Sequence, residues 1–549
     1  MSQVDDTQAR PTIGEALVTH LSARGITHVF GIPGVHTIEL YRGLANSGIR
    51  HITPRHEQGA GFMADGYARV NGQPAAVFVI TGPGISNTLT PMAQARADSV
   101  PMLTVSGANA TGSIGKGLGH LHELPNQQAL VAQVALVAEH VETAEGLDAA
   151  VDRAFAPLSG TQHIRPGPTH IQIPLDIAGK AATAPKERDA APQQSVTIAA
   201  ADSLADLRQR LRRCARPVLL VGGGAKAAAP QVRALAERMN APVVQTANAR
   251  GLMFDHPLSV PASPSLEAVR NLLKEADLVL ALGTEMGPTD YDMYARGLDL
   301  EIADLARVDI CEQQLHRYPA DLAIHGTVME VLDALADLRP EVGQVSEGWG
   351  SAKAAAVRSA AWQEIGEDYQ NQVSVLNALR LAAPRAIMVG DSTQPIYAGN
   401  LYYDHDRVGG WFNAATGYGA LGFAIPAAVG AAIAAPGTRV ICIAGDGGAQ
   451  FSMPEIMTAV DENLPITFVI WNNHGYQEIA RSMDDVGVTV LGCDPTPPDF
   501  AAAAQSFGIP FQSVSSDPAT VSDAIRAFGK EQGPSMLEIR SEQYQPHHR

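Results

Sequence analysis

The segment 440–476, VICIAGDGGAQFSMPEIMTAVDENLPITFVIWNNHGY, carries the side chains with the clearest chemistry. A strand-like run ends in GDGG at 445–448, a helical stretch follows, and a second strand-like run ends in two asparagines. Glycines at a strand end let backbone N–H groups approach a diphosphate, and a following helix N-terminus favours negative charge. Asp446 and Asn473 offer the carboxylate and amide oxygens that Mg²⁺ prefers. The pattern predicts a site for a diphosphate and a hard cation, although glycine-rich turns after strands are also common without a ligand.

The same alternation of a short β-branched run, a turn and a helical stretch recurs along the chain. It is typical of parallel α/β sheets, in which ligands bind just beyond the carboxyl ends of the strands. Two stretches, 181–198 and 339–355, lose apolar periodicity and gain Pro, Gly, Ala and charge, so we interpret them as linkers. We therefore predict three doubly wound parallel-sheet α/β domains, at 1–180, 199–338 and 356–549. The expected strands are 27–32, 75–81, 102–106, 217–221, 278–282, 387–389, 440–444 and 466–471, and a helix is expected over 14–25.

The bulk composition excludes several classes of protein. With 549 residues, 46% of them hydrophobic and 17% charged, the chain has ample apolar surface for several cores. The net charge of −18 argues against nucleic-acid and membrane-surface partners, because both need clustered Lys and Arg. No apolar run has the length of a transmembrane helix, and the first residues lack the layout of a signal peptide. Four well-separated cysteines suit a reducing compartment, so we expect a soluble cytoplasmic protein.

The joint pattern of GDG, a helix, a strand and NN resembles a known cofactor motif. It is the motif of the thiamine diphosphate (ThDP) enzymes of the pyruvate decarboxylase and acetohydroxyacid synthase superfamily. The resemblance implies that ThDP is bound through Mg²⁺, with Asp446, the Asn473 side chain and the Gly475 carbonyl as metal ligands. It also implies contacts between the cofactor and Gly445, Gly447, Gly448 and Tyr476. The resemblance covers nearly the whole chain, in the order pyrimidine domain, central domain, diphosphate domain.

A second motif, RHEQGAGFMADGYAR at 55–69, closely resembles the segment around the family's activating glutamate. ThDP becomes a nucleophile only when its C2 proton leaves, and the family uses a buried carboxylic acid to protonate the aminopyrimidine ring. Glu57 falls at that position. A lone Glu at a helix start is otherwise a partner of the helix dipole. The nearby loops GIPGVH (31–36) and TGPGISN (81–87) are also family-like, so the resemblance assigns the activating role to Glu57 and places Gly34 at the cofactor.

The last third contains two more family-like segments. In GYGALGFAIP (417–426), Leu421 matches the bulky residue that bends the cofactor, with core packing as its alternative role. Gly419 matches the residue whose carbonyl meets the 4′-amino group. Hydroxyl and amide groups suited to the diphosphate follow the strand AIMVG, at Ser392, Thr393 and Gln394. A plain helix N-cap is the equally weighted alternative for these three.

The combination of GVHTIELYRGL, RHEQGAGFMADGYARV, GKGLGHLHE and GPTDYDMYARG is most similar to the branch of 5-guanidino-2-oxopentanoate (2-ketoarginine) decarboxylases. A guanidinium tail needs carboxylates for bidentate pairing. Glu478 is the first candidate, ahead of Asp290 and Asp292, whose alternative is to face solvent. His122 lies near the position where synthases carry a catalytic-site Gln, and His120 accompanies it. A surface-exposed His pair is the alternative for these two.

Other features narrow the choice within the family. Residues 283–287 (GTEMG) stand where several relatives carry an Arg-Phe-Asp associated with FAD, so we expect no FAD. The run GGGAKAAAP at 222–230 contains no GxGxxG, and we interpret it as a strand–helix turn rather than a dinucleotide site. Val35 occupies the position where related decarboxylases often place Asp or Ser, which puts their proton relay in doubt.

The sequence thus predicts ThDP- and Mg²⁺-dependent decarboxylation of a small-molecule 2-oxo acid to CO₂ and an aldehyde. The alternatives are an acetolactate synthase-like carboligase, a non-catalytic binding protein on the same fold, and a dehydrogenase. In the family, Glu57 of one subunit would meet the cofactor held by Asp446 of another. The resemblance therefore implies a homodimer as the minimum unit and a homotetramer as the usual assembly. The C-terminal residues 541–549 form either a lid or a frayed end.

Overall fold

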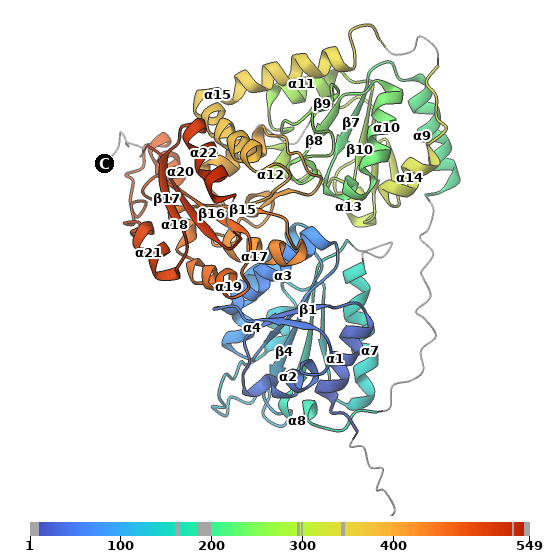
Figure 1. The fold of residues 1–549 in the computed structure, drawn as a ribbon. Coiled ribbons are helices and arrows are strands. Elements are labelled where there is room, and N and C mark those ends of the chain that lie inside the picture. Colours follow the sequence, from blue (N-terminus) through green and yellow to red (C-terminus); the bar gives the residue numbers. More distant parts are fainter. Residues whose placement is uncertain are drawn as a thin grey trace, which may run out of the picture. The chain divides into compact units, whose positions relative to one another are not determined.

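A computed structural model of the chain describes residues 10–159, 165–183, 199–293, 297, 300–341, 346–529 and 532–542. They form two compact units, one containing a single sheet and the other containing two (Figure 1). Most of the predicted linker 181–198 lies outside the described residues, as does 543–549 of the C-terminal tail. None of the described helices has the length and apolar character needed to cross a membrane.

The first unit is a parallel six-stranded sheet with strand order β2-β1-β3-β4-β6-β5. Its strands are β1 (His28–Gly31), β2 (Arg50–Ile52), β3 (Ala76–Val79), β4 (Met102–Ala108), β5 (Val137–His140) and β6 (Pro168–Pro174). Its helices are α1 (Ile13–Ala23), α2 (Ile38–Leu44), α3 (Glu57–Asn71), α4 (Pro83–Asn87), α5 (Leu89–Ala97), α6 (Gln127–Val131), α7 (Leu147–Phe155) and α8 (Leu175–Ala178). Side chains alternate along the strands, so Val29 and Phe78 join α1 and α7 in one core. Helix α3 packs on β1, β3 and β4.

The first sheet of the second unit is also parallel, with strand order β12-β11-β10-β7-β8-β9. Its strands are β7 (Pro217–Val221), β8 (Val243–Gln245), β9 (Ser259–Val260), β10 (Leu278–Leu282), β11 (Leu305–Asp309) and β12 (Leu322–His325). The helices around it are α9 (Ala201–Arg213), α10 (Ala229–Met239), α11 (Glu267–Glu275), α12 (Pro288–Tyr291), α13 (Glu312–Arg317) and α14 (Val328–Ala334). The order reverses between β7 and β10, which makes the sheet doubly wound.

The last sheet is parallel as well, with strand order β14-β13-β15-β16-β18-β17. Its strands are β13 (Ile387–Gly390), β14 (Trp411–Asn413), β15 (Val440–Gly445), β16 (Ile466–Asn472), β17 (Phe511–Ser515) and β18 (Ser535–Arg540). Its helices are α15 (Ser351–Ala382), α16 (Gln394–Leu401), α17 (Ala424–Ala434), α18 (Asp446–Ala449), α19 (Ile456–Asp461), α20 (Gln477–Asp485), α21 (Phe500–Phe507) and α22 (Pro518–Phe528). Helices α15 and α22 share one core with alternate residues of β15 and β16.

The three parallel sheets confirm the predicted fold class. The strands predicted at 217–221 and 278–282 match β7 and β10 residue for residue, and the other six agree within two residues at either end. Within the stretch 339–355, which we interpreted as a linker, residues 342–345 lie outside the described residues. Helix α15 already begins at Ser351, and the Trp349 indole donates a hydrogen bond to the Pro217 carbonyl (2.9 Å) from a buried position. A buried aromatic anchor overrides the polar composition of this stretch.

A buried polar network stiffens the first unit beside its strand ends. The Ser106 hydroxyl lies 2.8 Å from Nε2 of His170, and the Gln127 amide donates to Ser106 (3.0 Å). Thr81 donates to Oε1 of Gln127 (2.7 Å), which ties the loop after β3 to the same group. Burial lowers the pKa of His170 to about 3, so the imidazole is neutral inside the fold.

We predict that His170 makes the protein sensitive to acid. The unfolded chain protonates this imidazole below a pKa of about 6.5, whereas the folded chain does so only near 3. The contribution of the neutral His170 to the free energy of unfolding is therefore fully present above about pH 6.5. It is lost as the pH falls toward 3, at about 1.4 kcal/mol per pH unit. The free energy of unfolding in urea, measured from about pH 6.5 to 5, should fall less steeply in His170→Gln than in the parent. Equal slopes would contradict this assignment.

Candidate active site

Three loops of the second unit meet at one edge of the last sheet. Strands β13, β15 and β16 are neighbours and run parallel, so their carboxyl ends lie side by side. The loops that follow them are 391–394, 445–448 and 472–476. These loops contain most of the residues that the sequence predicted for the diphosphate and the cation.

The glycines of the second loop are required by close neighbours. A Cβ on Gly447 would lie 2.5 Å from the ring of Tyr476, and one on Gly445 would lie 2.9 Å from the hydroxyl of Thr393. Both positions therefore lack a side chain, which leaves backbone N–H groups accessible at the strand end, as diphosphate binding requires. Thr393 stands at the N-cap position of α16, but its side chain makes no capping hydrogen bond. The plain N-cap role that we considered for Thr393 is therefore not what its hydroxyl performs.

Asp446 connects the ends of β15 and β16. Its carboxylate is buried, and Oδ2 accepts a hydrogen bond from the Gly475 N–H (2.9 Å) while Oδ1 accepts a longer one from the Asn473 N–H (3.4 Å). Burial raises the pKa of the Asp446 carboxyl, and these two N–H groups act against that rise. Gly475 has φ +128°, and a Cβ there would lie 2.2 Å from the Cys493 carbonyl oxygen, so only glycine fits.

The amide nitrogen and the amide oxygen of Asn473 face different partners. Nδ2 donates to Oε1 of Gln394 (2.9 Å), and the same oxygen accepts from the indole N–H of Trp471 (3.0 Å). Oδ1 of Asn473 consequently lies 3.1 Å from Oδ1 of Asp446 and 2.9 Å from the carbonyl oxygen of Gly475. In this orientation Oδ1 of Asn473 faces two acceptors, whereas in the opposite orientation the NH₂ group would donate to both.

This arrangement fits a hard divalent cation. Oxygens so close together repel unless a positive charge lies among them. A cation held octahedrally at Mg²⁺–O distances of about 2.0–2.1 Å sets neighbouring ligand oxygens about 2.9 Å apart. No group of three His, Cys, Asp or Glu side chains within the described ranges could hold a metal. The ligand set of Asp446, Asn473 and Gly475 is instead one carboxylate, one amide oxygen and one backbone carbonyl, which are the donors that Mg²⁺ accepts.

Asp391 connects the first loop to the segment 417–423. Burial raises the pKa of Asp391 to about 6, although several backbone N–H groups act against the rise. Its oxygens accept from the N–H groups of Ser392 (2.8 Å), Gly422 (3.0 Å) and Ala424 (3.3 Å). The segment that it anchors contains an exposed Gly419 with φ +76° and a half-buried Leu421. Their predicted contacts with the cofactor remain predictions.

Glu57 belongs to the first unit, where it is the first residue of α3. The loop after β3 turns at Gly82 (φ +66°) and leads into α4, whose last residue, Asn87, donates its amide to Oε2 of Glu57 (3.0 Å). Asn87 is the last residue of the TGPGISN motif, and no feature of the sequence distinguishes it from its neighbours. Glu57 is half-buried.

The structure separates the two predicted histidines. His120 is exposed in a turn, as our alternative for it described. His122 adopts φ +61° and packs its backbone against Gly82, where a Cβ would lie 2.6 Å from the His122 carbonyl oxygen. Its ring centroid is 5.6 Å from that of His36, which is buried and bonded to Asn109 (3.1 Å). Burial lowers the pKa of His36; Asn109 acts against this, and nearby His122 adds to it.

Of the three candidate carboxylates, Glu478 lies nearest the cation ligands in the hydrogen-bond network. It is in the first turn of α20, and its Oε1 accepts from Nε2 of Gln394 (2.7 Å). Asp290 accepts from the Ala247 N–H (3.3 Å). Asp292 forms an ion pair with Arg270 (3.2 Å), so its charge is already compensated within the chain.

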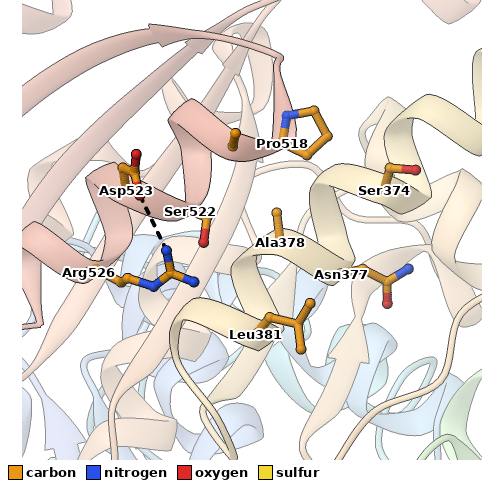
Figure 2. A pocket seen from close by; sticks show the side chains of 9 residues that line it. Ser374, Asn377, Ala378, Leu381, Pro518, Ser522, Asp523 and Arg526 are labelled. Atoms are coloured by element: carbon orange, nitrogen blue, oxygen red, sulfur yellow. Dashed lines mark hydrogen bonds and ion pairs between the residues drawn. The ribbon is translucent and has the colours of Figure 1, made fainter.

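An open groove on the surface of the second unit lies outside the predicted site. It occupies about 470 Å³ between α15 and α22, and its charged residues are Asp523 and Arg526, which pair with one another at 3.2 Å (Figure 2). None of the predicted site residues lines it.

The glycine run after β7 closes a turn. A Cβ on Gly222 would lie 2.3 Å from the carbonyl oxygen of Gly283, and the Gly224 N–H donates to the same oxygen (3.0 Å). The loops after β7 and β10 are thus in backbone contact at the point where strand order reverses. The expectation that the chain binds no FAD stays a prediction.

Three family models match the chain in succession. Residues 11–130 match the N-terminal TPP binding domain of thiamine pyrophosphate enzymes, residues 204–335 the central domain, and residues 391–539 the C-terminal TPP binding domain. Thiamine pyrophosphate and ThDP are the same molecule. The three matches follow the order that the motifs implied.

Whole-chain relatives agree with these matches. A probable 2-ketoarginine decarboxylase of Pseudomonas aeruginosa is 37% identical, over 96% of this chain and 94% of its own. The acetolactate synthase isozyme 1 large subunit of Escherichia coli is 29% identical, over 98% and 95%. The fold is similar to that of a ThDP-dependent 4-hydroxybenzoylformate decarboxylase of Rhodococcus jostii, with TM-score 0.81 and 23% identity over 97% and 99% of the two chains. These findings confirm the family resemblance, and the chain belongs to the thiamine pyrophosphate enzyme family.

Proposed function

We propose that this chain decarboxylates a 2-oxo acid to CO₂ and an aldehyde, with ThDP and Mg²⁺ as its cofactors. The observation that carries the proposal is that the Asn473 amide, with Nδ2 on Gln394, places Oδ1 3.1 Å from Oδ1 of Asp446 and 2.9 Å from the Gly475 carbonyl at the ends of β15 and β16. Such a cluster is costly without a cation, and Mg²⁺ in proteins usually shares its ligands with phosphate groups. The bare glycine loop beside it suits a diphosphate.

Each predicted residue then has a separate task. When bound, ThDP supplies the nucleophilic carbon and the electron sink that decarboxylation needs. The backbone of 445–448 and the hydroxyls of Ser392 and Thr393 receive the diphosphate, with Tyr476 alongside. Glu57 carries the activating proton. Because Asn87 donates to Oε2 of Glu57, that proton belongs on Oε1.

The remaining cofactor contacts follow the family pattern. Gly34 and the carbonyl of Gly419 would meet the aminopyrimidine end, and Leu421 would pack against the cofactor. His122 and its neighbour His36 lie beside the loop after β3 and are our candidates for contact with the substrate carboxylate. His120, being exposed, is the weaker candidate.

For the substrate we favour 5-guanidino-2-oxopentanoate. The 37% identity with a probable 2-ketoarginine decarboxylase supports this choice. Glu478 supports it too, because its carboxylate is held through Oε1 by Gln394 and a carboxylate can pair with a guanidinium group. Since Gln394 also contacts Asn473, this carboxylate is two hydrogen bonds from the cation site.

A carboligase is the second candidate function. It would use the same residues up to CO₂ release and then join the product carbon to a second carbonyl compound. The acetolactate synthase relatives, among them that of Escherichia coli at 29% identity over 98% of the chain, favour it. A non-catalytic binding protein would have no use for an oriented Glu57.

The proposal includes an assembly. By the family arrangement, Glu57 of one subunit activates the cofactor held by Asp446 of its partner, so a homodimer is the minimum unit and a homotetramer is expected. We also retain the cytoplasm as the expected location.

The proposed reaction is tested by its products. The chain, loaded with ThDP and Mg²⁺, is incubated with 2-ketoarginine and separately with pyruvate, and both CO₂ and the carbon product are measured. We expect CO₂ and the guanidino aldehyde in equal amounts from 2-ketoarginine. Acetolactate from pyruvate, without aldehyde from either acid, would establish the carboligase instead.

Glu57→Gln tests the activating acid. We expect the variant to bind ThDP and Mg²⁺ as the parent does but to lose about 10²–10⁴-fold in kcat, because an amide cannot supply the proton. Cofactor binding is followed by calorimetry and turnover by CO₂ release. The exposed Glu145 of the same unit, changed to Gln, is the control and should stay active. Full activity of Glu57→Gln would overturn the assignment.

Glu478→Gln tests recognition of the cationic tail. A charge-assisted hydrogen bond contributes about 1.5–3 kcal/mol, so kcat/KM for 2-ketoarginine should fall about ten- to hundredfold. The value for a neutral 2-oxo acid of similar length should change little. Asp290→Asn, the weaker candidate, should leave the ratio unaltered. An unchanged ratio in Glu478→Gln would remove this residue from substrate recognition.

A further inference from the structure

Gln394 lies at the start of α16 and is 9% exposed, and both ends of its amide are engaged. Oε1 accepts from Trp471 (3.0 Å) and from Asn473 (2.9 Å), while Nε2 donates to Glu478 (2.7 Å). This one side chain therefore contacts both Asn473, a proposed cation ligand, and Glu478, the carboxylate proposed to bind the substrate's cationic tail.

Two partners fix which end of the Gln394 amide faces Asn473. An indole N–H can only donate, so the atom facing Trp471 must be the amide oxygen. A carboxylate can only accept, so the atom facing Glu478 must be the amide nitrogen. Both requirements select the same orientation. Gln394 consequently presents an acceptor to Asn473.

The Asn473 amide has a competing orientation. Turned over, its NH₂ group would lie 3.1 Å from Oδ1 of Asp446 and 2.9 Å from the Gly475 carbonyl, and would donate a hydrogen bond to each. Those two bonds would present donors where the cation needs oxygens. In that orientation Oδ1 of Asn473 would instead meet Oε1 of Gln394 at 2.9 Å, with no hydrogen between them. Within this network, Gln394 is the group that opposes the turn.

We propose that Gln394 is a positioning residue that keeps the Asn473 amide oxygen turned toward the cation site. The proposal rests on the proposed function, because it needs Mg²⁺ to bind at Asp446, Asn473 and Gly475. Without a strong acceptor at position 394, the turned-over orientation is favoured, because the Asn473 NH₂ group then donates to Asp446 and Gly475. The cation site would then present N–H donors in place of the Asn473 oxygen. Through its other end, the same amide holds the carboxylate of Glu478, so cation binding and substrate recognition share one hydrogen-bonded group.

The test measures cation binding in the full-length protein with ThDP present, using Mn²⁺ as the probe because its EPR signal reports free ion. The variant Gln394→Met has nearly the same shape, and its thioether sulfur is a much weaker acceptor than the amide oxygen. We expect its Mn²⁺ affinity to fall about 10–100-fold, the usual effect of losing a hydrogen-bond partner of a metal ligand. Mn²⁺ that still binds should carry one more water in place of the Asn473 oxygen, seen as extra line broadening in ¹⁷O-labelled water. A merely structural role would not add a water.

Two further variants isolate the orientation. Glu478→Gln removes the carboxylate but leaves Trp471 to fix Gln394, so its Mn²⁺ affinity should match that of the parent. The double variant Trp471→Phe, Glu478→Gln keeps Gln394 but removes both groups that fix it, so its affinity should fall, though by less than in Gln394→Met. The double variant decides the matter if Gln394→Met does not fold.

The outcomes separate this inference from the proposed function. A parent protein that binds no Mn²⁺ with ThDP overturns the proposed function. A parent that binds, with Gln394→Met or the double variant binding equally well and with the same number of waters, overturns only the role of Gln394.

Discussion

The Asn473 amide faces the Asp446 carboxylate and the Gly475 carbonyl, and the rest of the candidate site depends on which end of that amide is turned toward them. Oδ1 of Asn473 is 3.1 Å from Asp446 and 2.9 Å from the Gly475 carbonyl. A bound divalent cation turns this costly contact into a favourable one. The protein must hold the three groups in place before the cation arrives, which requires a rigid scaffold behind them.

That scaffold is the parallel sheet of the second unit. Because β13, β15 and β16 are adjacent and parallel, their loops reach the same edge without any long excursion. The buried carboxylate of Asp391 ties the first of these loops to the segment carrying Leu421. Gln394 then links the first loop to the third through Asn473. The first unit repeats the pattern at its own strand ends, where Asn87 orients Glu57.

Much of this was predictable from the sequence, for identifiable reasons. Strand positions followed from β-branched runs bounded by Gly, Asp and Asn, and they agree with the structure to within two residues. Asp446 and Asn473 could be paired because strand ends in a parallel sheet converge. The fold class and the family followed from the order of the motifs, and the comparisons confirm both.

The parts that could not be predicted depend on contacts between distant segments. Nothing near Gln394 in the sequence indicates that Trp471, Asn473 and Glu478 share its amide, so its partners appear only in three dimensions. His36 likewise gains interest only from the ring of His122 at 5.6 Å. The start of α15 at Ser351 was not predicted. The residue just before it, Trp349, is held by a hydrogen bond to the Pro217 carbonyl of β7, and a contact between segments more than a hundred residues apart leaves no pattern in the local sequence.

The central claim is that these three oxygens form a cation site whose remaining ligands come from the diphosphate of ThDP. The most direct measurement is a crystal structure of the protein grown with ThDP and Mn²⁺, with the metal located by its anomalous scattering. The account predicts one Mn²⁺ bonded to Asp446, Asn473 and the Gly475 carbonyl, with Glu57 of a neighbouring subunit at the pyrimidine ring of the same cofactor. A metal peak elsewhere, or a cofactor out of reach of every Glu57 in the assembly, would contradict it.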